Sequence, residues 1–418
     1  MKKILSIFAL FCMTISASAE EGLFTVTTTE SKRCTVVFAD GEGASGATIQ
    51  AREGKTVTIS ITPEAGYVLK SVSAEAVGND WNIARAAAVD ILSSIALTKV
   101  EENKYTFTMP RADVQVSASC IISINASGEK TKDDPADEKE DVVKGLKLML
   151  SEYDDEEPVV IDGVTYHKVK VDSTYIPETT TQKSITIKVP GISQVGNHVF
   201  VISEITEDAF KSTTDIKVTK VILPETEEVI EIAEGAMSPD GEPIEIQTPL
   251  ALLDDYALMS SLQENFEAVK IYALAKSPNR YWTFSSGVDV IIPEGILVYG
   301  VYMSDGTVNT LQAQPIDEAN NSGIIKANNG VLVSCTNARG GDIYTMVANP
   351  GRQKSGTTPA TTNAKDYKDN RMAPVIVSHH YNKGDILILK NNEFHTIKTS
   401  GDEIKVPACK AVLNLVNE

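Results

Sequence analysis

The sequence predicts a mainly β, multidomain protein. Most of its 418 residues fall in short runs that alternate apolar and polar side chains or are rich in Val, Ile and Thr, which is the pattern of half-buried strands. A chain of this length exceeds one hydrophobic core, and about three domains are expected. The composition changes abruptly at residues 125–141 (NASGEKTKDDPADEKED), where charged and small polar residues predict a solvated linker.

Residues 1–19 have the features of a secretory signal peptide. Lys2 and Lys3 precede an apolar run, and Ala17-Ser18-Ala19 supplies a small-residue cleavage site. No later apolar stretch is long enough for a membrane span. Removing the two lysines takes the formal net charge from −19 to −21, which repels phosphate backbones, so nucleic acid is not an expected partner. We expect an exported protein that is extracellular or at the cell surface, outer-membrane association included.

Residues 20–124 form the first expected domain, a set of short strands with one helix. The turn at residues 63–66 (PEAG) offers Gly66 for a positive φ. The Ala-rich segment at residues 81–95 has the apolar spacing of a helix. The predicted strands are residues 34–38, 55–63, 67–74, 105–110 and 114–120.

Two phrases in this domain carry a family resemblance. GKTVTISITPEAGYVL, followed by YTFTMPRADVQVSAS, resembles the divergent internalin-type B-repeat module of bacterial surface proteins. The likeness covers most of the domain and departs from the family in a long insert at residues 75–104. It implies a small β-grasp-like spacer or binding module without catalysis.

A near-repeat marks the second expected domain, residues 142–270. EITEDAF at residues 204–210 recurs as EIAEGAM at residues 231–237, with a Leu-Pro pair between them. Each unit offers an apolar strip that a neighbouring unit must cover, so we expect these side chains to be buried together. The repeat-core residues are Ile205, Ala209, Phe210, Leu223, Ile232, Ala236 and Met237.

With DGVTYHKV and VFVISEI, these phrases resemble the BspA-like leucine-rich repeat. The spacing around Leu223 is longer than in that family, and no third Ala-Phe phrase follows Met237. A solenoid normally needs three or more repeats, so we expect a cap on this short segment. Residues 249–268 are the candidate, with a helical apolar face that suits either core packing or a ligand groove.

Residues 271–418 form the third expected domain. Turn-forming residues followed by a hydrophobic run occur in IPEGILVY (292–299), IKANNGVL (325–332) and VPACKAVL (406–413), which predicts tight turns leading into strands. This region resembles the β-rich C-terminal domain that often follows BspA-like repeats in proteins exported by anaerobic gut and oral bacteria. Cys409 stands where the family phrase has Gly, so we expect a left-handed backbone there.

Four cysteines follow the signal peptide, and their spacing fits no zinc pattern. In an exported protein, pairing within each domain is the simplest disulfide scheme, with Cys34 joined to Cys120 and Cys335 joined to Cys409. Four buried free thiols are the alternative.

The sequence contains no recognisable catalytic or nucleotide-binding motif, so we expect no catalytic, cofactor-binding or metal-binding residues. Acidic clusters at residues 133–141 and 154–157 lack the pattern of a calcium loop. Tyr281, Trp282 and Tyr299 are the candidate sugar-stacking residues, although a Trp at such a place also serves as a core plug.

These features predict a non-catalytic recognition or adhesion protein that binds a host or neighbouring-cell protein or glycan. The alternative is a glycan-binding protein that captures carbohydrate at the cell surface. An enzyme would instead need a pocket in which carboxylates or histidines converge.

Overall fold

The computed structural model has two compact units, residues 1–122 and 123–418, and is mainly β, as predicted. It describes residues 22–41, 43, 45–77, 93–130, 143–153, 157–177, 184–211, 216–226, 228–263, 269–303, 311–335, 340–349, 367, 370–382, 384–396 and 403–414. The expected signal peptide lies outside these residues. Among the helices so described, none is long and apolar enough to cross a membrane.

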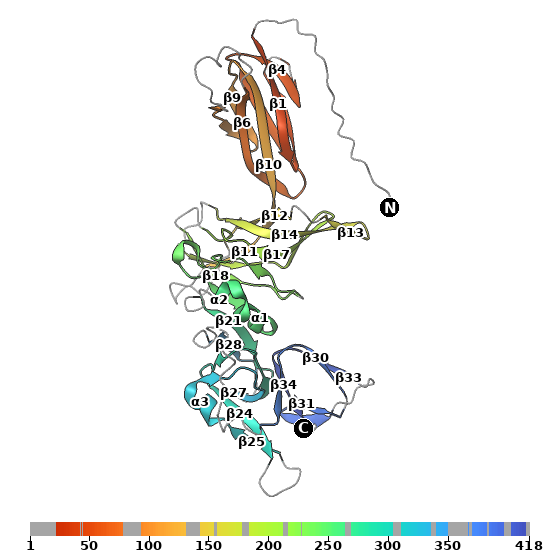
Figure 1. Cartoon of the computed structure of the whole chain (residues 1–418), viewed down its shortest axis with the longest axis vertical. Helices are drawn as coiled ribbons and strands as arrows, with labels where there is room; N and C mark the ends of the chain where they lie inside the picture. Colours follow the sequence, from red (N-terminus) through yellow and green to blue (C-terminus); the bar gives the residue numbers. More distant parts are fainter. Residues whose placement is uncertain are drawn as a thin grey trace. The chain divides into compact units, whose positions relative to one another are not determined.

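The first unit consists of two sheets, ordered β4-β1-β10-β6-β7 and β3-β2-β5-β9-β8 (Figure 1). Alternating burial along β2, β5 and β10 places one face of each strand in the core. The strands are β1 (Leu23–Lys32), β2 (Cys34–Ala39), β3 (Ser45–Gly46), β4 (Thr48–Arg52), β5 (Thr56–Pro63), β6 (Tyr67–Val77), β7 (Ser93–Ser94), β8 (Thr98–Glu101), β9 (Lys104–Thr108) and β10 (Asp113–Asn125).

The structure corrects two boundaries from the sequence. The helix expected at 81–95 does not extend through its last residues, because Ser93 and Ser94 form β7, which pairs with β6. Residues 81–92 lie outside the described ranges. In the expected linker, β11 (Ser127–Lys130) pairs with β15 (Ser184–Lys188), so these residues belong to a sheet. These polar residues form a strand because hydrogen bonds to β15 satisfy their backbone N–H and C=O groups.

The second unit begins with strands that alternate between two parallel ladders. One ladder is β14-β17-β19 and the other is β15-β18-β20-β21. The remaining bounds here are β12 (Lys147–Glu152), β13 (Val159–Ile161), β14 (Val164–Tyr175), β16 (Ile192–Val195), β17 (His198–Ile205), β18 (Lys217–Ile222), β19 (Glu231–Ile232), the 3-10 turn η2 (Pro239–Gly241), β20 (Glu245–Thr248) and β21 (Ile271–Lys276).

The same backbone bonds recur from one turn of the ladder to the next. The Thr206 N–H donates to the Val171 carbonyl at 3.0 Å, and one turn later the Ala233 N–H donates to the Ile205 carbonyl at 2.9 Å. All seven repeat-core residues are buried, Phe210 and Met237 among them, as predicted. The two ladders contain more strands than the phrases EITEDAF and EIAEGAM predict. Strands β14, β15, β20 and β21 belong to the ladders although no Ala-Phe phrase follows them.

The expected helix at 249–268 is shorter and divided. It consists of a 3-10 turn, η3 (Leu250–Leu252), and two helices, α1 (Leu253–Leu258) and α2 (Ser260–Gln263), with an extended Met259 between the helices; residues 264–268 lie outside the described ranges. Helix α1 packs against β21. The buried Tyr256 hydroxyl accepts a hydrogen bond from the Ile230 N–H at 3.1 Å, which ties the helix to the repeat segment.

The sheet β11-β15-β18-β20-β21-β28-β23-β26 continues across the expected domain boundary at residue 270. Its strand β21 pairs with β20 on one side and with β28 on the other. The later elements are β22 (Tyr281–Phe284), β23 (Val290–Ile291), β24 (Ile296–Met303), β25 (Leu311–Pro315), α3 (Asp317–Ser322), β26 (Ile324–Ile325), β27 (Val331–Cys335), β28 (Ile343–Ala348), β29 (Met372–Val375), β30 (His379–Asn382), β31 (Ile386–Lys390), β32 (Glu393–Thr396), β33 (Glu403–Val406) and β34 (Lys410–Asn414). Three smaller sheets, β22-β27-β24-β25, β29-β34-β31-β32 and β30-β33, complete the unit.

Candidate functional site

A groove of about 830 Å³ lies in the second unit, on the strands β13, β14, β16 and β17. This volume falls within the usual range for ligand pockets. Its lining is mainly apolar, with charged residues among it. The lining residues are Glu152, Glu157, Pro158, Val159, Tyr166, His167, Lys168, Gly191, Ile192, Val201, Ile202, Ser203, Pro224, Glu225, Thr226, Glu228 and Val229.

Local sequence explains the first wall of the groove. Asp162 and Gly163 both have positive φ and join β13 to β14 through a two-residue turn, as the Asp-Gly pair predicts. Across the sheet, Lys168 of β14 is in register with Val201 of β17, and Val201 is in register with Ile192 of β16. Residues in register point to the same face, so the three side chains form one row across three strands.

The opposite wall is formed by residues 224–226 and 228–229, in the segment that follows β18. Gly191 makes a close approach to it, since a Cβ there would lie 2.7 Å from Thr226 Cγ2 and 3.3 Å from Pro224 Cγ. The Gly191 carbonyl also accepts a hydrogen bond from the Ile202 N–H at 3.1 Å. A glycine at this position therefore sets the width of the groove at this wall.

Several large apolar side chains at the groove are open to solvent. Ile192 is 62% exposed and Val159 is 58% exposed, and the Tyr166 side chain is also exposed. Exposed apolar side chains that gather on one concave surface are typical of binding sites, whereas single ones are common everywhere.

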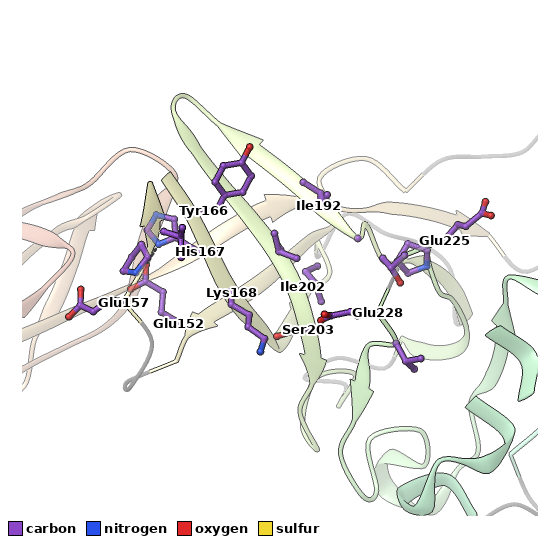
Figure 2. A pocket seen from close by; sticks show the side chains of 17 residues that line it. Glu152, Glu157, Tyr166, His167, Lys168, Ile192, Ile202, Ser203, Glu225 and Glu228 are labelled. Carbon is purple, nitrogen blue, oxygen red and sulfur yellow. Dashed lines mark ion pairs between the residues drawn. The ribbon is translucent and has the colours of Figure 1, made fainter. Parts of the chain in front are cut away.

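Carboxylates lie at both ends of the groove. Figure 2 shows Glu152 and Glu157 near His167 at one end, with Glu225 and Glu228 toward the other. Lys168 lies between the two groups. The lining therefore carries four acidic side chains against one lysine and one histidine.

A row of titratable side chains adjoins the groove beneath one end. His167 is 3% exposed, its Nδ1 lies 2.9 Å from Glu152 Oε1, and its Nε2 lies 2.9 Å from Nδ1 of His198. The His167 ring also contacts Phe200, with ring centroids 5.2 Å apart. Both ring nitrogens of His167 thus face a protein partner, which fits a structural contact better than proton transfer to a ligand.

The three candidate sugar-stacking residues do not form one platform. Tyr281 and Tyr299 lie on the same face of the β22-β27-β24 sheet, through their registers with Ser334 and Leu332. Trp282 points to the opposite face, is 3% exposed, and packs edge-on against Phe284 at 6.0 Å. The stacking role is therefore wrong for Trp282, because alternation along β22 turns its side chain into the core.

The first expected cysteine pair lies together. Cys34 and Cys120 are buried neighbours, and no disulfide joins them in the structure. Burial raises the pKa of the Cys120 thiol to about 12, and the adjacent Cys34 thiol adds to the rise. In the structure both are buried free thiols, as in the alternative to the disulfide scheme.

The second expected pair is contradicted. The Cys335 thiol contacts the Arg280 carbonyl at 3.2 Å, whereas the Cys409 thiol contacts the Leu250 carbonyl at 3.0 Å, and both cysteines are free thiols. Cys409 does have the left-handed backbone expected from its Gly-like position, with φ of 57°. Its burial raises the pKa of the thiol to about 12, and the nearby Asp254 carboxyl adds to that rise.

Sequence reasoning missed the groove, since its walls come from segments far apart in the chain. The one local signal was the run of apolar residues before the Asp-Gly turn, which β13 leaves exposed. Among the described residues, no group of three or more His, Cys, Asp or Glu side chains is placed to hold a metal ion.

Comparison with known proteins gives no match: no family model, no curated protein and no solved structure is similar to this chain.

Proposed function

We propose that this chain is an exported, non-catalytic recognition protein that binds a surface protein of a host or neighbouring cell through the groove of its second unit. The observation that carries the proposal is the concave apolar surface formed by the strands β13, β14, β16 and β17. A surface of this kind costs solvation free energy while it is empty and regains it when a ligand covers it.

The chemistry of the groove favours binding over catalysis. Glu157, Glu225 and Glu228 are exposed at the rim, where water solvates and screens them. The nearest histidine, His167, has its nitrogens directed at Glu152 and His198.

The sequence resemblances support the same type of function. A B-repeat-like first unit, a BspA-like repeat segment and a β-rich C-terminal region are modules of exported surface proteins, and we propose them as the family relations of this chain. The two parallel ladders agree with a repeat segment in which each strand is covered by the next.

Glycan capture is the second candidate function. Tyr281 and Tyr299 share one face of a sheet and are both partly exposed, which suits contacts with sugar rings. Without Trp282 on that face, the platform is smaller than a three-aromatic site. A glycan array in which wild type binds and Tyr281→Ala does not would favour this candidate.

Recovery of a partner from extracellular-matrix and cell-surface extracts, by the chain without residues 1–19, tests the proposed function. Ile192→Arg places a long charged side chain in the groove, and Val377→Arg is the control, because Val377 is 75% exposed and does not line the groove. We expect a protein partner that wild type and Val377→Arg recover and Ile192→Arg does not. Equal recovery by all three chains would contradict a role for the groove.

A further inference from the structure

We propose that the groove binds an extended peptide segment that has apolar side chains at its centre and a lysine or arginine near each end. This inference rests on the proposed function and names the ligand class that the groove would take.

The apolar centre of the ligand follows from the middle of the groove. Ile192 and Val201 lie in register on adjacent strands, and Tyr166 stands on β14 beside them. Covering such side chains removes apolar surface from water, which favours binding. A uniformly polar or charged ligand would not make apolar contacts with these side chains.

The length of the ligand follows from the strands. The groove crosses β13, β14, β17 and β16, which are neighbours in that order. Neighbouring strands lie about 4.8 Å apart, so three intervals span about 14 Å, the length of roughly four extended residues.

The charges at the ends of the ligand follow from the carboxylates. Glu157 lies at one end of the groove, and Glu225 and Glu228 lie toward the other, all three exposed. The whole chain carries a formal charge of −19, so its long-range field also attracts a cationic ligand. Each exposed ion pair contributes little, and cationic groups at both ends add their effects.

The test uses a fluorescein-labelled probe, Lys-Val-Phe-Val-Lys, and two probes in which Gln or Glu replaces both lysines. Fluorescence anisotropy at low and high salt gives the affinities for the chain without residues 1–19. We expect the Lys probe to bind roughly tenfold more tightly than the Gln probe at low salt, with the Glu probe weakest. High salt should reduce the difference between the Lys and Gln probes.

The matched variants locate the effect. The double variant Glu225→Gln/Glu228→Gln removes the carboxylates at one end and keeps Glu157 at the other. It should weaken binding of the Lys probe about threefold and leave binding of the Gln probe unchanged. The double variant Glu53→Gln/Glu102→Gln is the control for net charge, because both residues are exposed in the first unit, outside the groove, and the change removes the same two charges. It should bind all three probes as wild type does.

Two results would overturn the inference and can be told apart from failure of the proposed function. Equal affinities for the Lys and Gln probes would refute the charge preference. If no probe binds while partner recovery still depends on Ile192, the ligand is not a short basic peptide, although the groove remains the recognition site. Loss of that dependence on Ile192 would refute the proposed function itself.

Discussion

Two parts of the second unit place carboxylates very differently. At the groove, Glu157, Glu225 and Glu228 are exposed beside exposed apolar side chains. Away from the groove, Asp254 and Asp289 are buried, and each accepts hydrogen bonds from neighbouring residues. Asp254 accepts hydrogen bonds from the Ser286 hydroxyl and from the Gly287 N–H, the latter at 2.6 Å.

The buried aspartates stabilise the fold through specific partners. Asp289 accepts from the Lys326 ammonium at 3.2 Å and from the Ala327 N–H at 2.9 Å, and both side chains of this ion pair are buried. A buried charge that loses its partner is costly, whereas an exposed carboxylate is solvated and costs little to remove. We therefore expect the groove carboxylates to be dispensable for folding and available for a ligand.

The largest expected effect on stability is the truncation of a buried repeat residue. Phe210→Ala should lower the free energy of unfolding by about 3–5 kcal/mol, because it leaves a cavity where a fully buried ring packs. Ile192→Ala, at the groove, should change it by less than about 0.5 kcal/mol. Urea denaturation measures both, and similar losses for the two variants would remove the distinction between core and groove.

A loss of similar size is expected when the buried ion pair is broken. Asp289→Ala leaves the Lys326 ammonium without its buried carboxylate and should cost about 3–5 kcal/mol. Glu228→Ala removes an exposed carboxylate and should cost less than about 0.5 kcal/mol. A destabilised Glu228→Ala would mean that the groove charges contribute to the fold.

The stability contribution of Asp254 should depend on pH. Burial raises the pKa of this carboxyl above its usual 3.8, although the bonds from Ser286 and Gly287 act in the opposite direction. The folded chain therefore holds the proton more tightly than the unfolded chain. The contribution is fully present below the unfolded pKa and is lost as the pH rises through the folded pKa.

The matched variant for this test is Asp254→Asn, which cannot ionise. Urea denaturation from about pH 4 to about pH 7 should show wild type losing stability relative to Asp254→Asn as the pH rises. A difference between the two chains that does not change with pH would show that Asp254 has no shifted pKa.

The smallest expected effect on stability concerns Cys409, the residue with a left-handed backbone near Asp254. Both Cys409→Gly and Cys409→Ala remove the thiol, and alanine keeps the Cβ at φ of 57°. Cys409→Ala should therefore be less stable than Cys409→Gly by about 1 kcal/mol. Thermal unfolding of the two variants checks this, and an alanine variant as stable as the glycine variant would contradict the strain.

Features determined by a few neighbouring residues could be predicted from the sequence. These include the Asp162-Gly163 hairpin, the burial of Phe210 and Met237, and the left-handed backbone at Cys409. Each depends on a turn preference or on a local apolar pattern.

Features that depend on pairing between distant segments could not be predicted. The row from Lys168 to Ile192 needs the register of three strands, and the face that receives Trp282 depends on which side of its sheet is covered. The partner of Cys335 similarly follows from packing that the sequence does not encode locally. The parallel ladders also recruit strands whose phrases differ from the repeat.

The most direct test of the account is the affinity of the Lys-Val-Phe-Val-Lys probe for wild type and for Glu225→Gln/Glu228→Gln, measured by anisotropy at low salt. We predict that the variant binds this probe about threefold more weakly than wild type does, because Glu157 still attracts the lysine at the other end. Equal affinity of the two chains for the Lys probe would contradict the claim that the groove carboxylates serve a ligand.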